Sequence, residues 1–311
     1  MFGRFRIRTD LALEARESFE EEDVKIRGVR IEEEEDKELE LHTTTVVIET
    51  ENGAKTMGKP VGTYITMEAP NMSVPDEGYH REISEKLAEH LRTLMGEGEK
   101  SVLIVGLGNR DVTPDALGPY VVQNVRITRH LIREYGAASL GEEQMNPISG
   151  IVPGVMAQTG IETVDIVRGI CDEIDVEIVV AIDALAARSS KRLGCTIQLT
   201  DTGISPGSGV GNNRKTLSSD NLGRRVIAVG VPTVISVPSI IDDSLDEVAD
   251  AFNETYGRRI MREFTEKQRY QIACNLLDED MADMFVTPKN IDELVRRISF
   301  TISEAINAIA M

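Results

Sequence analysis

Apolar residues along this 311-residue chain follow two periods, one typical of strands and one typical of helices. Apolar runs predict buried strands at residues 102–105, 177–182, 195–200 and 226–231. Apolar positions spaced three and four apart predict helices at residues 82–94, 120–135, 161–173 and 291–309. Helices that alternate with strands are typical of an α/β fold, so we predict a mostly parallel sheet flanked by helices.

The N-terminal third carries a different pattern. β-Branched stretches at residues 43–50 and 62–67 predict two strands, and Glu51-Asn52-Gly53 predicts a turn at the start of the segment between them. Residues 32–36 are all acidic, which is typical of a solvated face or a loop. We therefore predict an N-terminal acidic and β region at residues 11–98, packed on an α/β core at residues 99–311.

Charge and composition narrow the class of partner and the compartment. A formal net charge of -19 disfavours direct binding to nucleic acid, whose phosphates attract Lys and Arg, and a basic protein or peptide fits better. Three cysteines without C-x-x-C spacing indicate neither a disulfide framework nor a thiolate zinc site. The basic residues 1–8 are not followed by the apolar segment of a secretory signal, and prolines interrupt the apolar stretch 226–241. We expect a cytoplasmic protein that does not contact a membrane.

Two glycine motifs suggest chemistry that their neighbours disfavour. Gly106-x-Gly108 follows a strand as in dinucleotide folds, but Asp111 stands where that motif needs its third glycine. The sequence from Gly203 to Gly207 matches the G-x-S-x-G of hydrolases, but Pro206 has no N–H to stabilise an oxyanion. We therefore predict a tight turn at the first motif and a loop at the second, and we expect no nucleotide cofactor.

Two aspartates are the strongest candidates for chemistry. Asp115 and Asp183 each follow an apolar strand and each enter a helix-like segment. In an open parallel sheet, ligands bind outside the carboxyl ends of the strands. Two carboxylates held close share a proton, so one can act as general acid and the other as general base on an attacking water. Structural roles for both, or a carboxylate-bound metal ion, remain open, although the chain has no H-E-x-x-H zinc motif.

Five segments together resemble the germination protease family of endospore-forming bacteria. They are Val105-Gly106-Leu107-Gly108-Asn109 with Val112-Thr113-Pro114-Asp115-Ala116-Leu117-Gly118-Pro119, Ile182-Asp183-Ala184-Leu185-Ala186-Ala187-Arg188, Gly58-Lys59-Pro60-Val61-Gly62-Thr63-Tyr64, Pro153-Gly154-Val155-Met156-Ala157-Gln158-Thr159-Gly160 and Asp201-Thr202-Gly203-Ile204-Ser205-Pro206-Gly207. The resemblance implies an endopeptidase that degrades small acid-soluble spore proteins in the spore core. It also implies a homotetramer, a fold similar to hydrogenase maturation proteases, and Asp115 and Asp183 as the catalytic pair.

The resemblance further implies a precursor that removes its own leader. Substrates of the family are cut after the acidic residue of a Thr-Glu-Ile/Phe-Ala-Ser-Glu segment, which Thr9-Asp10-Leu11-Ala12-Leu13-Glu14 resembles. We therefore predict cleavage between Asp10 and Leu11, which makes residues 1–10 a propeptide. Candidates for positioning substrate are Asn109, Gly207, Ser208 and Gly209. Two alternatives stay open: the same peptidase activity with a carboxylate-bound metal, and a non-catalytic acidic protein that binds basic partners.

Overall fold

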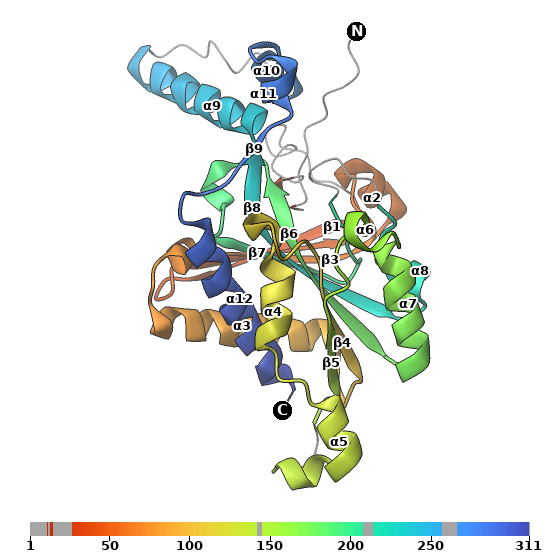
Figure 1. Cartoon of the computed structure of the whole chain (residues 1–311). Helices are drawn as coiled ribbons and strands as arrows, with labels where there is room; N and C mark the ends of the chain where they lie inside the picture. Colours follow the sequence, from red (N-terminus) through yellow and green to blue (C-terminus); the bar gives the residue numbers. More distant parts are fainter. Residues whose placement is uncertain are drawn as a thin grey trace.

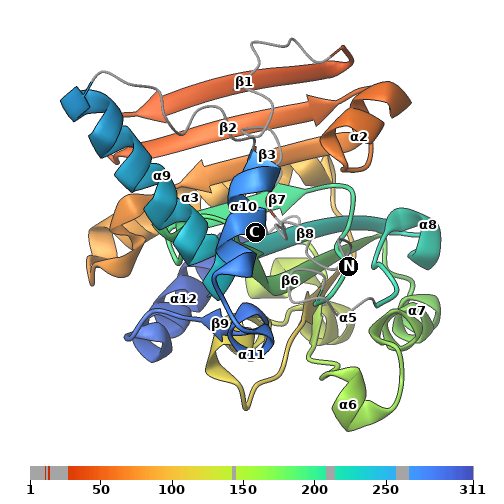
Figure 2. The same ribbon diagram turned by 90° about the horizontal axis from the view of Figure 1, so that it is seen from above.

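The fold is built on one mixed sheet. The computed structural model describes residues 11, 13–14, 27–141, 145–207, 214–256 and 266–310, and in these residues nine strands join in the order β1-β2-β3-β7-β8-β6-β4-β5, with β9 beside β8. The strands are β1 (Val29–Asp36), β2 (Leu41–Ile48), β3 (Gly62–Glu68), β4 (Val102–Gly106), β5 (Ile148–Ile151), β6 (Ile178–Ala187), β7 (Thr196–Thr200), β8 (Arg225–Ser236) and β9 (Phe285–Val286). Figure 2 shows strands β1 to β3 running beside β7, β8 and β6.

The predicted α/β class is confirmed, but the prediction of a mostly parallel sheet is wrong. Only β8, β6, β4 and β5 are parallel neighbours, and the other pairs are antiparallel. Parallel neighbours need a long crossover, usually through a helix. Residues 37–40 are the whole connection between β1 and β2, and the connection from β6 to β7 contains only a short 3₁₀ helix, η4 (Ser190–Arg192). These connections are too short for a helical crossover.

Helices cover both faces of the central strands (Figure 1). The helices of the described residues are α2 (Glu51–Met57), α3 (Glu77–Met95), α4 (Leu117–Asn124), α5 (Arg129–Tyr135), α6 (Met156–Thr159), α7 (Thr163–Ile174), α8 (Ser219–Leu222), α9 (Val237–Tyr256), α10 (Glu266–Asn275), α11 (Glu279–Ala282) and α12 (Ile291–Ile309). Three further 3₁₀ helices are η1 (Pro70–Ser73), η2 (Thr113–Asp115) and η3 (Ala137–Leu140). No helix in the described ranges is long and apolar enough to cross a membrane.

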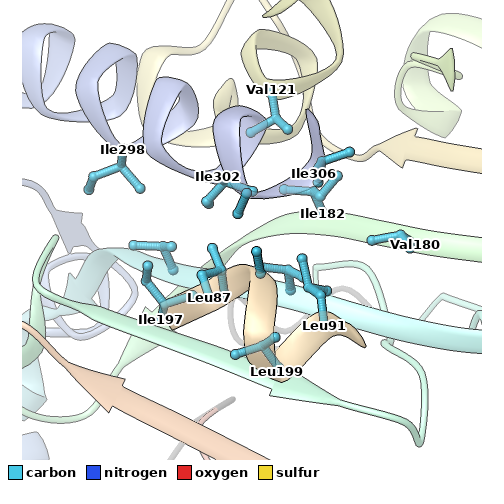
Figure 3. Packing of buried hydrophobic residues seen from close by; sticks show 14 of the residues in the cluster. Leu87, Leu91, Val121, Val180, Ile182, Ile197, Leu199, Ile298, Ile302 and Ile306 are labelled. Carbon is cyan, nitrogen blue, oxygen red and sulfur yellow. The ribbon is translucent and has the colours of Figure 1, made fainter. Parts of the chain in front are cut away.

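Side chains of the central strands point alternately to the two faces of the sheet and pack into two separate hydrophobic cores. In β4, Val102 and Ile104 pack toward α3, α4 and α12, whereas Leu103 and Val105 pack toward α7 and α8. This alternation is the expected two-residue period of a strand buried on both faces. Figure 3 shows the first core, where Ile302 and Ile306 of α12 lie over Ile182 of β6. Ile182 is thereby fixed directly before Asp183.

Two sequence predictions fail at helix boundaries. The predicted turn at Glu51-Asn52-Gly53 is the first turn of α2, because the Thr50 hydroxyl accepts the Gly53 N–H and caps a helix there. The single helix predicted at residues 120–135 is two helices, α4 and α5, separated at residues 125–128. The helix predicted at residues 291–309 is confirmed as α12.

The N-terminal β element is confirmed as an extension of the sheet. Strand β1 is an edge strand, and its acidic residues 32–35 are exposed, so the acidic run is a solvated face and not a loop. Charged side chains along an edge strand oppose pairing with other chains. Strands β2 and β3 then join β1 to β7. The division at residue 98 remains a prediction, and residues 1–10 lie outside the described residues.

Candidate active site

A tight turn after β4 positions Asp115. Gly108 has a φ of 102°, and a Cβ built there would lie 2.0 Å from the Asp115 carbonyl oxygen, so only glycine fits. The Asn109 N–H donates to Asp115 Oδ2 at 2.7 Å. The predicted tight turn at the first glycine motif is therefore confirmed, and it folds residues 109–115 back over the end of β4.

Asp183 lies inside a strand. The prediction that a helix begins at this residue is wrong, because residues 184–187 continue β6 and pair with β8. Alanine favours helices in isolation, but pairing with a neighbouring strand outweighs that preference. The Asp183 side chain is 4% exposed, and its Oδ1 accepts the Ala184 N–H at 3.0 Å. The strand therefore holds this carboxylate in a fixed, buried position.

Backbone contacts bring the two aspartates' supporting segments together. The Leu107 N–H donates to the Ile182 carbonyl oxygen at 2.8 Å, which joins the turn after β4 to the residue before Asp183. At the start of α4, a Cβ on Gly118 would lie 2.5 Å from that same carbonyl oxygen. The Thr233 hydroxyl on β8 donates to the Pro114 carbonyl oxygen at 2.7 Å. The segment carrying Asp115 is thus fixed against both β6 and β8.

Asp115 and Asp183 line one cleft of about 520 Å³. Its walls come from the turn after β4, from residues 154–157, from β6, from residues 206–207 and from residues 285–287. Of the predicted positioning residues, Asn109 and Gly207 line the cleft, whereas Ser208 and Gly209 lie outside the described residues. Asp111 is exposed and is not among the described residues that line the cleft. A peptide segment could enter this cleft and meet both carboxylates.

Sequence reasoning missed the C-terminal wall of the cleft. Residues 285–287 reach it because β9 pairs with the end of β8, and the Thr287 hydroxyl donates to the Thr233 carbonyl oxygen at 2.8 Å. Neither Thr233 nor this short segment carries a motif, so no local signal could have identified them. Residues 154–157 did carry a signal, because they belong to one of the segments that resemble the germination proteases.

The G-x-S-x-G match does not form a nucleophile in this cleft. The Ser205 hydroxyl lies 2.7 Å from the Thr216 hydroxyl, and Ser205 lines a smaller neighbouring cavity of about 240 Å³. The loop prediction is confirmed for Ser205 to Gly207, where no helix begins. Among the described side chains, no group of three or more His, Cys, Asp or Glu is arranged to hold a metal ion.

Burial raises the pKa of the Asp115 carboxyl, and the Asn109 N–H bond to its oxygen opposes part of that rise. A raised pKa keeps a larger share of the carboxyl protonated than in an exposed aspartate. Perturbed carboxyls in a cleft are typical of functional sites. The pKa shift makes Asp115 the candidate for the protonated member of the pair.

The same pKa shift predicts how stability depends on pH. We expect Asp115→Asn to raise the melting temperature near neutral pH, because the neutral amide removes the cost of burying an ionised carboxylate. The folded-state pKa is raised, so the wild-type chain loses stability as pH rises through that value. The advantage of the variant should fade below about pH 4, where the carboxyl is protonated in both states. Thermal melts across this range check the prediction, and an advantage that grows on acidification would contradict it.

Known proteins that are similar in sequence to this chain belong to one family. A sequence model of the germination protease family matches residues 7–274. The chain is similar to the germination protease of Caldanaerobacter subterraneus subsp. tengcongensis, with 42% identity over 307 residues that cover 97% of this chain and 93% of the relative. It is also similar to the germination proteases of Clostridium perfringens, with 40% identity, and Bacillus cytotoxicus, with 37%. Those alignments cover 97% and 98% of this chain and 94% of each relative.

Proposed function

The chain belongs to the germination protease family and is a protease, and from this premise we propose that it is an endopeptidase that degrades small acid-soluble spore proteins. The observation that carries the proposal is that Asp115 and Asp183 line the same cleft. The Leu107 N–H bond to the Ile182 carbonyl oxygen joins the turn after β4 to β6, and the Thr233 hydroxyl bond holds Pro114 against β8, which favours a fixed distance between the two carboxyl groups. The formal charge of -19 is consistent with a protein substrate and with no direct binding of nucleic acid.

In the proposed mechanism the two carboxyl groups share one proton. Asp183 accepts a proton from a water molecule, and the water oxygen attacks the carbonyl carbon of the scissile peptide bond. Asp115, whose pKa burial raises, donates its proton to the leaving nitrogen. The peptide C–N bond breaks and leaves a new carboxyl group and a new amine, without a covalent enzyme intermediate. Asn109 and Gly207 line the cleft and help to position the substrate backbone.

Digestion of a purified small acid-soluble spore protein, with and without a chelator, tests this function. We expect discrete fragments whose new N-termini follow an acidic residue, at rates that the chelator leaves unchanged. Sequencing of the fragments measures both results. An intact spore protein would contradict the peptidase proposal and favour an acidic binding protein. Cleavage that a chelator stops and added metal restores would instead favour a carboxylate-bound metal.

We also propose self-processing between Asp10 and Leu11. Purified precursor should lose its first ten residues and yield a chain that starts at Leu11, because Thr9-Asp10-Leu11 resembles the family's cleavage segment. Intact-mass spectrometry over time measures this loss. Mature chains that begin at any other residue would refute the assigned site.

Other family properties are proposed on the resemblance alone. We propose a homotetramer located in the forespore and spore core, without a cofactor. We also propose that the parallel strands β8, β6, β4 and β5 and their helices are similar in fold to hydrogenase maturation proteases. Size-exclusion chromatography with light scattering tests the assembly.

A further inference from the structure

Residues just downstream of the proposed cleavage site are buried in the body of the protein. Leu11 is 0% exposed, Leu13 is 4% exposed and Glu14 is 2% exposed. A buried glutamate is rare unless it is paired, because a carboxylate loses its hydration when it leaves water. Glu14 therefore needs a binding site of its own.

That site surrounds the Glu14 carboxylate with donors. The Arg188 N–H lies 3.1 Å from Oε1 and 3.0 Å from Oε2, and the Ser189 N–H donates to Oε1 at 3.0 Å. The Arg192 guanidinium lies 3.3 Å from the same Oε1. Both partners of this ion pair are buried, with side-chain exposures of 9% for Arg192 and 1% for Glu14. Hydrogen bonds to an ionised acceptor are stronger than neutral ones, so this is a specific anchor.

The anchor is held rigidly by three elements. Arg188 and Ser189 directly follow β6, the strand that carries Asp183. Arg192 also donates through its Nε to Glu68 of β3 at 3.1 Å. The next residue after Ser189, Ser190, donates its N–H and its hydroxyl to Asp243 of α9, at 2.7 and 2.8 Å. A carboxylate bound here is therefore fixed relative to the sheet.

The anchor also lies close to the cleft. Ala186 lines the cleft and precedes Arg188 by two positions, which is a rise of about 7 Å along an extended chain. Three peptide units link Leu11 to Glu14, so their Cα atoms are at most about 11 Å apart. The chain from Leu11 to Glu14 is thus long enough to reach the cleft wall, although Leu11 is buried outside the described residues that line the cleft.

We propose that Glu14 is the positioning residue for self-cleavage: it holds the Asp10–Leu11 bond in register with the cleft. The inference rests on the proposed self-processing and deepens it. In that reaction, water adds its oxygen to the Asp10 carbonyl carbon, the C–N bond to Leu11 breaks, and Leu11 gains the proton of a new amine. Glu14 does not touch the reacting atoms. It acts through the chain, by limiting which bond can enter the cleft.

The rate and position of self-cleavage in full-length Glu14→Ala and Glu14→Gln chains test this role. We expect Glu14→Ala to release the leader at least tenfold more slowly and to give mixed N-termini around Leu11. Glu14→Gln should be intermediate, because its amide oxygen can still accept the two N–H groups. Once cleaved, both variants should digest a small acid-soluble spore protein with a kcat/KM within twofold of wild type. The matched control is Glu35→Gln on the exposed edge strand β1, which should process like wild type.

The outcomes separate this inference from the proposed function. A folded Glu14→Ala chain that releases its leader at the wild-type rate and only at Leu11 would refute the anchor, while the peptidase proposal would stand. A cleaved Glu14→Ala chain that digests the spore protein much more slowly than cleaved wild type would also refute it, because that pattern indicates general structural damage. A wild-type chain that never loses its leader would refute the self-processing on which the anchor depends.

Discussion

Asp183→Asn should reduce peptide hydrolysis by about a thousandfold or more while leaving the fold intact, within the range measured when an acid–base group is removed. Asparagine matches aspartate in shape, and its Oδ1 can still accept the Ala184 N–H. It cannot take a proton from water at the pH of the assay, so the attacking hydroxide does not form. We expect the loss of activity to appear in kcat, and we expect the melting temperature to stay within about 4 °C of wild type.

The matched control is Asp111→Asn. Asp111 lies in the same turn as Asp115, but it is exposed and outside the set of described cleft residues. Its variant should cleave within about twofold of wild type, because an exposed substitution away from the site changes little. Digestion of a small acid-soluble spore protein, followed by sequencing of the fragments, measures both variants. Retained cleavage in Asp183→Asn would remove Asp183 from the catalytic pair.

Gly118→Ala should damage both activity and stability, although glycine to alanine normally favours a helix. The added Cβ would lie 2.5 Å from three backbone atoms, the Ile182 carbonyl oxygen and the N and O of Leu107. Backbone cannot rotate away as a side chain can, so α4 must move away from the residue after β4 and from the middle of β6. We expect the free energy of unfolding to fall by about 1–3 kcal/mol, as for other overpacked sites. A displacement of about 1 Å between Asp115 and Asp183 can lower kcat about a hundredfold.

Gly169→Ala provides the control for the substitution itself. Gly169 is an exposed glycine within α7, and a Cβ added there would meet no heavy atom of the described residues within 4 Å, apart from nearby helix backbone and its chain neighbours. This variant should gain about 0.5–1 kcal/mol, because alanine has the higher helix propensity. Chemical denaturation and digestion assays measure both chains. Equal behaviour of the two variants would show that the close approach at Gly118 is unimportant.

The local elements were largely predictable because local periodicity encodes them. The pattern at residues 291–309 gave the bounds of α12 as the structure has them, and the apolar run at residue 102 gave β4. The turn after β4 was also predictable, because Gly108 adopts a left-handed φ that favours glycine over other residues. Errors arose where a distant partner decides the outcome: residues 184–187 look helical but pair with β8.

By itself the sequence determined the α/β class, the acidic surface, the family resemblance and the two aspartates as candidates, because each depends on residue types and spacing along the chain. Tertiary structure alone decided that Asp115 and Asp183 line one cleft, that residues 285–287 close it, and that Glu14 binds at the end of β6. The physical reason is that these arrangements arise from strand order and backbone approach between segments far apart in sequence. Motifs can mark the residues as candidates, but the contacts between them leave no periodic pattern in either segment.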